Sequence, residues 1–191
     1  TIGGFAGGSC FNDGLIDDVR IYNRALNEEE IKRLYRMGST FYVNSPKTYQ
    51  LTDGLVGYWT FDSKDTSMYL GTTTTVFDKS GQGNTGTIRN DAKVIKGKLG
   101  QALEFDGVEA EIDVGSGASL DDLGPMTYAA WIKPDNQGEN NDGTIIEKGP
   151  TTAGRISISL FDDGGANLRQ LYIFKDYDGA TNLERDTANN A

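Results

Sequence analysis

Residues 14–35 read GLIDDVRIYNRALNEEEIKRLY, and this stretch carries the clearest structural signals in the chain. Its first half alternates with the two-residue period of a β-strand. One face of that strand would carry Leu15, Asp17, Val19 and Ile21, and the other face Ile16, Asp18, Arg20 and Tyr22. Because both faces carry apolar side chains, we expect the strand inside a sheet rather than at a free tail.

The second half of the stretch has the start and stop signals of a helix. Asn27 occupies the N-cap position and Glu30 follows three residues later, which is the spacing of a capping box. Gly38 supplies the stop signal. The pattern predicts one short helix over residues 28–37, with an apolar stripe made of Ile31, Leu34 and Tyr35.

The composition limits the possible functions. The 191 residues carry a formal net charge of −10, and they include 25 Gly, a single Cys and no His. Abundant glycine favours a turn-rich, all-β protein. The lack of His excludes Ser-His-Asp and Cys-His catalysis and any His-ligated metal within the chain. The negative charge disfavours nucleic acid, and no apolar run approaches the roughly 20 residues of a membrane span, so we expect no membrane insertion.

Two segments resemble one known family. The run IDDVRIYNRAL (residues 16–26) followed by a short helix resembles the closing segment of laminin-G-like, concanavalin A-like domains. The run GLVGYWTFD (residues 54–62) resembles the first strand of the same family. The resemblance implies an all-β fold, an antiparallel two-sheet jelly-roll sandwich with one short helix near residues 28–37.

The two resembling segments stand in an unusual order. Residues 1–38 correspond to the closing strand and helix of such a domain, residues 39–53 to an extended linker, and residues 54–191 to the opening two-thirds of a domain. The chain is either cut from a tandem array, or folded so that residues 1–38 return to the open sheet edge of residues 54–191. An exposed apolar edge is costly, so we expect residues 1–38 to cover it. The array favours a neighbouring molecule, and hence head-to-tail self-association by strand exchange.

Further elements can be placed by their patterns. Alternation predicts a half-buried strand over residues 108–114 and another over about residues 126–133. Three more strands are expected at residues 144–147, 155–161 and 168–174, and the sequence DDGG at residues 162–165 predicts a hairpin turn between the last two. The threonines of residues 72–75 are expected in a polar loop.

The most specific candidate site is the loop DKSGQGN, residues 78–84. Ca²⁺ takes about six to eight oxygen ligands, and glycines allow a loop to bend around it. Asp78 and Asn84 would supply side-chain oxygens. In resembling domains this loop faces the closing strand, whose acidic pair here is Asp17 and Asp18. The alternative is an Asx-turn at Asp78, with a buried Asp17 satisfied by backbone N–H groups.

A catalytic alternative comes from the spacing of three acidic residues. Glu104, Asp106 and Glu109 fit the E-x-D-x-x-E spacing of retaining β-glucanases, which use two carboxylates about 5 Å apart. However, Asp106 and Gly107 also form a strong turn signal, which would place the two glutamates on different strands. The same residues fit a non-catalytic turn of the laminin-G-like family, so we expect no enzyme activity.

The function implied by the resemblance is a non-catalytic carbohydrate- or protein-binding module of a larger secreted or cell-surface protein. Its partner would be a glycan or a surface protein, and Ca²⁺ would stabilise it. The alternative is a structural spacer, or a repeat that assembles head to tail by strand exchange. A glucanase-like glycoside hydrolase is the third reading. Fold alone decides none of these, since function belongs to sites.

Overall fold

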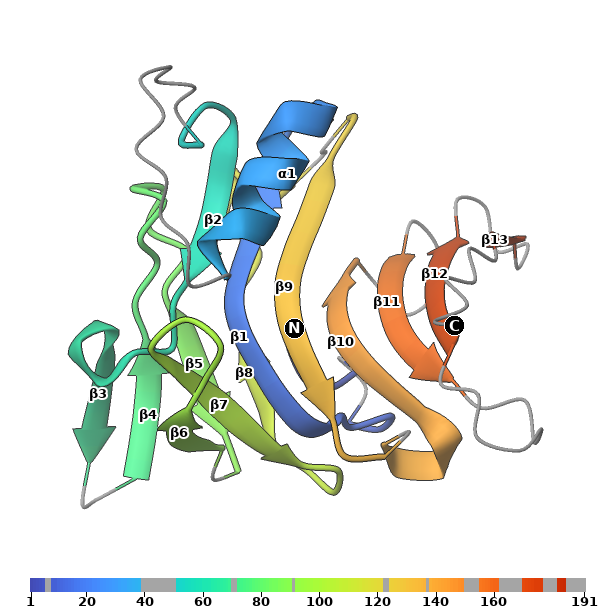
Figure 1. Ribbon diagram of the computed structural model, residues 1–191. Helices are drawn as coiled ribbons and strands as arrows, with labels where there is room; N and C mark the ends of the chain where they lie inside the picture. Colours follow the sequence, from blue (N-terminus) through green and yellow to red (C-terminus); the bar gives the residue numbers. More distant parts are fainter. Residues whose placement is uncertain are drawn as a thin grey trace.

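The computed structural model describes residues 1–5, 8–38, 51–69, 72–90, 92–121, 124–136, 138–149, 155–161, 170–176 and 182–184. Within these ranges the chain is mostly β, with antiparallel strand pairing and one α-helix (Figure 1). The all-β expectation is therefore confirmed. No helix among the described residues is long and apolar enough to cross a membrane.

Strand β1 (Asp13–Tyr22) lies at the centre of a five-stranded sheet. The other strands of this sheet are β2 (Leu55–Trp59), β6 (Lys93–Lys96), β7 (Gln101–Asp106) and β9 (Thr127–Pro134). β9 pairs along one side of β1, while β7 and β2 share its other side. The sequence left open whether residues 1–38 pair with their own chain or with a neighbouring molecule. In the structure, β1 pairs with strands of its own chain.

The remaining strands form a second layer. One group contains β3 (Thr66–Tyr69), β4 (Thr72–Val76), β5 (Gly86–Arg89) and β8 (Glu111–Asp113). The other contains β10 (Asp142–Lys148), β11 (Arg155–Phe161), β12 (Gln170–Asp176) and β13 (Asn182–Glu184). Ile2 joins the two groups, because it forms antiparallel bridges to Ile112 in β8 and Ile146 in β10. The start of the chain is thus built into this layer.

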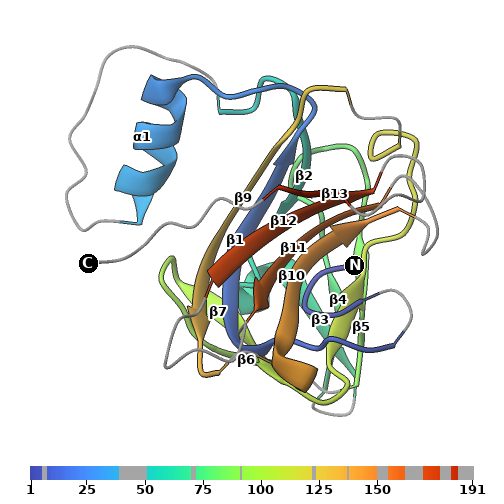
Figure 2. The ribbon, with the colours of Figure 1, turned by 90° about the vertical axis from the view of Figure 1, so that its right-hand side faces the viewer.

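Both layers contribute to one hydrophobic core. From the five-stranded sheet it takes Ile16, Val19, Ile21, Val56, Trp59, Leu103 and Phe105. From the second layer it takes Ile2, Val76, Ile88, Ile112, Ile145, Ile146 and Leu160. Figure 2 shows β10, β11 and β12 in front of β1 and β9, which is the arrangement that this shared core requires.

A bulge in β1 overturns the predicted alternation of its side chains. The register with β9 shifts between Asp17 and Arg20, and Asp18 has a φ of +53°. The extra residue places Ile16 and Val19 in the same core, although they lie three positions apart. Asp17 is buried as expected, but it does not share a face with Val19. Its carboxylate contacts the turn at residues 97–99 instead.

Helix α1 (Glu28–Met37) has the predicted bounds and both hydrogen bonds of the capping box. Its apolar stripe is less buried than a core-facing stripe would be, because Ile31 is 53% and Tyr35 68% exposed. The structure also has short 3₁₀ turns, η1 (Ser63–Asp65) and η2 (Glu139–Asn141).

Other strand predictions have mixed outcomes. The expected polar loop at residues 72–75 is wrong, because these β-branched threonines form most of β4. The strand expected over residues 108–114 is shorter, since Val108 is exposed in a turn and only β8 is regular. β11 and β12 pair as the predicted hairpin requires, whereas the turn at residues 162–165 and residues 39–50 of the linker lie outside the described residues.

Candidate functional site

Asp78 organises the glycine-rich loop that follows β4. Its Oδ1 accepts hydrogen bonds from the backbone N–H groups of Tyr58 and Ser80, at 3.0 and 2.8 Å. Its Oδ2 accepts from the Ser80 hydroxyl at 2.7 Å and from the Asn84 N–H at 2.9 Å. Both oxygens therefore hold two donors each, and the carboxylate fixes both ends of the loop and ties it to β2. This is the Asx-turn alternative that the sequence left open.

Asn84 connects the same loop to two further segments. Its side-chain Nδ2 donates to the Val56 carbonyl at 2.7 Å and to the Ser119 hydroxyl at 2.8 Å. Its backbone carbonyl accepts from the indole N–H of Trp59, which is fully buried. Gly117 lies so close that an added Cβ would be 2.3 Å from Asn84 Oδ1. The side chain is thus a structural link among three segments.

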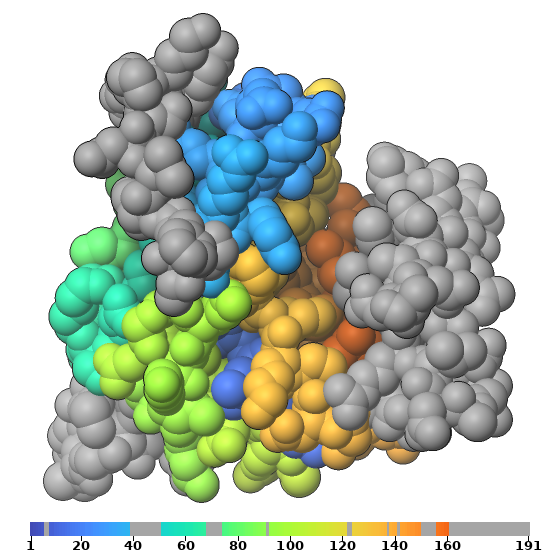
Figure 3. All heavy atoms as spheres, in the orientation of Figure 1, coloured from blue at the N-terminus to red at the C-terminus, as the bar shows by residue number. Residues whose placement is uncertain are grey.

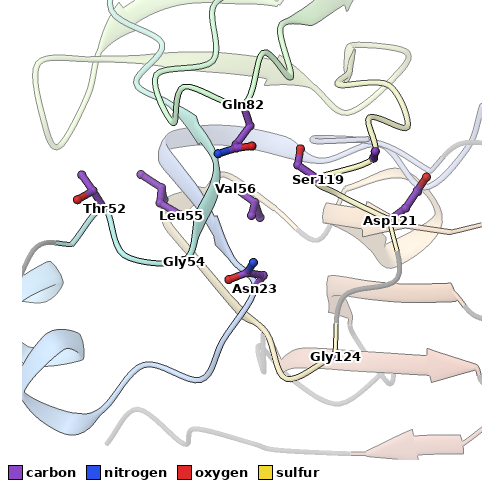
Figure 4. A pocket seen from close by; sticks show the side chains of 10 residues that line it. Asn23, Thr52, Gly54, Leu55, Val56, Gln82, Ser119, Asp121 and Gly124 are labelled. Atoms are coloured by element: carbon purple, nitrogen blue, oxygen red, sulfur yellow. The ribbon is translucent and has the colours of Figure 1, made fainter.

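These contacts build the walls of a polar pocket of about 480 Å³. The pocket is lined by residues from the end of β1, the start of β2, the glycine-rich loop and the loop after β8, as Figure 4 shows: Asn23, Thr52, Gly54, Leu55, Val56, Gln82, Ala118, Ser119, Asp121 and Gly124. The buried side chains of Leu55 and Val56 belong to the regular strand β2. Exposed loop residues supply the polar groups.

Three of the lining side chains are available to a ligand. Asn23, Gln82 and Asp121 are exposed, and within the described ranges no protein group hydrogen-bonds their side chains. By contrast, the Asn84 side chain is already bonded to Val56 and Ser119. The pocket therefore combines a fixed framework with two amides and one carboxylate that can bind polar groups of a ligand.

Asp17 lies in a different environment from Asp78. It is only 2% exposed, and its Oδ2 accepts from the Lys98 and Leu99 N–H groups, both at 2.8 Å. Its Oδ1 is buried and has no hydrogen-bond partner among the described residues. Burial raises the pKa of the Asp17 carboxyl to about 6, because the charged form loses its hydration.

Asp18 is engaged in a buried ion pair. Its carboxylate accepts hydrogen bonds from Arg20 Nε at 3.0 Å and Arg20 Nη2 at 3.2 Å. This bidentate contact pairs the negative charge of Asp18 with the positive charge of Arg20, two residues further along β1. Both oxygens of Asp18 are therefore engaged by Arg20.

The residues predicted to hold Ca²⁺ do not form one group. In the part of the chain that the structure describes, no three carboxylate, thiol or imidazole side chains gather closely enough to hold a metal ion. The expected convergence of Asp78 and Asn84 with Asp17 and Asp18 is thus wrong for these ranges. The reason is physical: each carboxylate has found protein donors in its own surroundings. Stabilisation by Ca²⁺, which the resemblance implies, is tested by melting in Ca²⁺ and in chelator.

The acidic residues of the catalytic alternative are arranged by a turn. Asp106 Oδ1 accepts from the N–H groups of Val108, Glu109 and Ala110, at 3.0, 3.2 and 3.2 Å. Glu104 lies in β7 opposite Leu15, and Glu109 is exposed in the turn. β7 and β8 belong to different layers, so the turn crosses between sheets and is not a hairpin. Asp106 therefore stabilises the turn between β7 and β8. This structural role explains an acidic residue at this position between Glu104 and Glu109 without catalysis.

Sequence reasoning located only part of the pocket. It singled out the glycine-rich loop that contains Gln82, and it recognised the segment that ends at Asn23. It gave no signal for Asp121. The loop that carries Asp121 is brought to the pocket by the hydrogen bond between Asn84 and Ser119, which are 35 positions apart. Comparisons with protein-family models, with curated proteins and with solved structures found no match to this chain.

Proposed function

We propose that the chain is a non-catalytic carbohydrate-binding module that binds a glycan in the polar pocket beside the glycine-rich loop. The observation that carries the proposal is the set of three polar side chains, Asn23, Gln82 and Asp121, which surround one depression and have no hydrogen-bond partner among the described residues. Amides donate and accept hydrogen bonds and a carboxylate accepts them, so together they match the neighbouring hydroxyl groups of a sugar.

The framework of the pocket supports specific binding. The Asp78 and Asn84 contacts hold the loop and its neighbours before a ligand arrives. A preformed site loses little conformational entropy on binding, and this favours recognition of a small polar ligand. The pocket lies at the ends of β1 and β2, where loops from several strands come together.

The fold adds an argument by analogy. Two antiparallel layers around one core support the interpretation as a concanavalin A-like jelly-roll sandwich, of the laminin-G-like kind. Modules of that kind occur in secreted and cell-surface proteins and bind glycans or proteins through loops, often beside Ca²⁺. We therefore propose an extracellular or cell-surface location, with a glycan as partner. This step rests on resemblance and not on the pocket geometry.

A glycan panel tests the proposal. We expect the full-length chain to bind at least one glycan class, and Gln82→Ala and Asp121→Ala to weaken that binding at least tenfold each, which corresponds to about 1.4 kcal/mol. Glu109→Ala, which changes an exposed acidic residue away from the pocket, is the matched control and should bind normally. Running the panel with and without a chelator separates calcium-dependent binding from calcium-independent binding.

Absence of glycan binding at millimolar concentrations would remove the proposal. Binding that survives both pocket substitutions would place the carbohydrate site elsewhere on the chain. Hydrolysis of a β-glucan that is lost in Glu104→Gln would instead support the enzymatic alternative.

A further inference from the structure

We propose that the free edge of β9 binds an extended peptide segment of a partner protein, which joins the five-stranded sheet as a sixth strand. This inference concerns a different surface from the polar pocket and does not depend on carbohydrate binding. It rests on three observations: the hydrogen-bonding groups of the edge, the recessed groove beside it, and the apolar side chains of that groove.

The first observation is which backbone groups of β9 have partners. The Asp135 N–H donates to the Asp13 carbonyl at 3.0 Å, which fixes the alternation of the antiparallel ladder. With this alternation, every second residue of β9 turns its N–H and C=O groups away from β1. These residues are Tyr128, Ala130 and Ile132, and no described contact uses their backbone groups. β9 pairs with β1 alone, so the outer edge is open in the described structure.

The second observation is the shape of the surface. A groove of about 380 Å³ runs beside β9, between α1 on one side and β10 and β11 on the other. Figure 3 shows atoms of β9 in the gap between α1 and β11. The edge is therefore recessed. The same edge of a second folded copy would lie in an equally deep groove, and two recessed edges cannot meet. A single chain segment can enter such a groove.

The third observation is the chemistry of the walls. The β10–β11 side presents Ile145, Ile146 and Ile158, and the α1 side presents Ile31, Leu34 and Tyr35. The rings of Tyr35 and Trp131 lie 5.7 Å apart, at the junction of α1 and β9. On β9 itself, Ile132 is 36% exposed. The charged residues that line the groove, Asp18 and Arg20, form a pair at 3.0 Å, and Lys98 Nζ lies 5.3 Å from the centre of the Trp131 ring.

Together these observations define the occupant. Free N–H and C=O groups spaced along a strand pair with another extended backbone, which is the geometry of strand addition. The added strand would place alternate side chains against the isoleucines of β10 and β11 and against the aromatic side of α1. Apolar walls around the paired Asp18 and Arg20 select a segment whose central residues are uncharged and rich in β-branched side chains. Exposed edges of this kind are usually protected. At the middle of β9, Lys98 Nζ lies over the Trp131 ring at 5.3 Å, and no described backbone contact uses the N–H and C=O groups of Ala130 and Ile132.

Tryptophan fluorescence measures binding directly. The chain has two Trp, and Trp59 is fully buried in the core, so a ligand in the groove changes the emission of Trp131. The probe is the synthetic peptide KVTVTVK with blocked ends, titrated into the full-length chain. The matched control is the same peptide N-methylated at alternate residues, which has the same charge but lacks the backbone donors that would face β9.

We expect a saturable change in Trp131 emission with the unmodified peptide and at least tenfold weaker binding of the N-methylated peptide. Ile132→Lys should also weaken binding at least tenfold, because it places a charge at the edge. Val108→Lys changes an equally apolar, exposed residue in a distant turn and should bind normally. If Ile132→Lys fails to fold, the comparison of the two peptides on the unchanged chain still decides the question.

Three outcomes would overturn the proposal. Equal binding of both peptides would show that the backbone donors play no part. No change in emission at millimolar peptide would show that the edge does not accept a strand. Concentration-dependent dimerisation in light scattering, abolished by Ile132→Lys, would identify a second copy of the chain as the occupant.

Discussion

Asp78 and Asp17 have the same side chain, and the structure supports them in two different ways. Asp78 holds four donors, three of which come from residues within six positions of it. Asp17 holds two donors, and both come from a turn more than 80 positions away. A loop with glycines can wrap around its own carboxylate, whereas a strand cannot. The carboxylate in the strand therefore depends on tertiary packing, and its Oδ1 has no hydrogen-bond partner in the part of the chain that the structure describes.

The close fit of the distant turn explains how Asp17 obtains its donors. An added Cβ at Gly97 would lie 2.6 Å from Asp17 Oδ2. The turn can approach the carboxylate only because this position has no side chain. The Asp78 region is thus stabilised locally, and the Asp17 region only when β1 and the turn come together.

The strongest test removes the Asp17 region completely. We expect residues 54–191 alone to lose the fold, because β1 pairs on both sides and contributes Ile16, Val19 and Ile21 to the core. Circular dichroism and amide exchange of this fragment measure the effect, with the full-length chain as the reference. A folded fragment with the stability of the whole chain would show that β1 is dispensable. Light scattering of the full-length chain tests head-to-tail self-association at the same time.

The next largest effect is expected from Asp78→Ala. This change leaves the N–H groups of Tyr58 and Asn84 without their acceptor, and an unsatisfied buried donor costs about 1–3 kcal/mol. We expect a loss of about 2–4 kcal/mol in the free energy of unfolding, measured by urea denaturation, because both hydrogen bonds are only partly buried. Glu109→Ala, at an exposed position, should change stability by less than about 0.5 kcal/mol. Similar losses in both variants would refute the structural role of Asp78.

The raised pKa of Asp17 predicts a pH dependence of the free energy of unfolding. The folded-state pKa is about 6, above the usual 3.8 of an aspartate, so between these two pH values the folded chain binds more protons than the unfolded chain. Stability is therefore retained below about pH 4, falls as pH rises through 6, and levels off above it. The shift corresponds to at most about 3 kcal/mol.

Urea denaturation between pH 4.5 and 8 measures this dependence. Asp17→Asn cannot ionise, so it should flatten the profile relative to the unchanged chain. Asp121→Asn, at an exposed position, is the matched control and should preserve the slope. A profile for Asp17→Asn that parallels the unchanged chain would show that Asp17 is not the titrating group.

Glu30 provides a smaller test of local support. Bidentate hydrogen bonds from Arg24, at 2.8 and 2.7 Å, and the N–H of Asn27 lower the pKa of this carboxyl to about 2. We expect Glu30→Gln to lower the free energy of unfolding by about 1 kcal/mol, because charge-assisted bonds are stronger than neutral ones. Glu29→Gln, in the same helical turn but exposed, should have no measurable effect. An equal loss in both variants would assign the effect to the helix dipole instead.

These cases show which features a sequence can reveal. The capping box of Asn27 and Glu30 depends on residues three positions apart, so the pattern predicts both the helix and its bounds. The burial of β1 was predictable from apolar residues on both faces. The bulge at Asp18 could not be predicted, because a single residue with positive φ leaves no recognisable spacing in the sequence. The bulge moves every later side chain of β1 to the face opposite the predicted one. Nor could the pocket be predicted, since Asn23, Gln82 and Asp121 meet only through tertiary contacts.

Calcium gives the smallest expected effect and the sharpest comparison between the two regions. Both oxygens of Asp78 already accept two hydrogen bonds, so an ion there would have to displace backbone donors. We therefore expect melting temperatures in millimolar Ca²⁺ and in chelator to agree within about 1 °C. A ligand at a hundred times its Kd would instead stabilise the fold by about 2.7 kcal/mol and raise the melting temperature by several degrees. If such a rise occurs and Asp78→Asn removes it while Asp17→Asn does not, the loop binds calcium. If Asp17→Asn alone removes it, Oδ1 of Asp17 is the ligand.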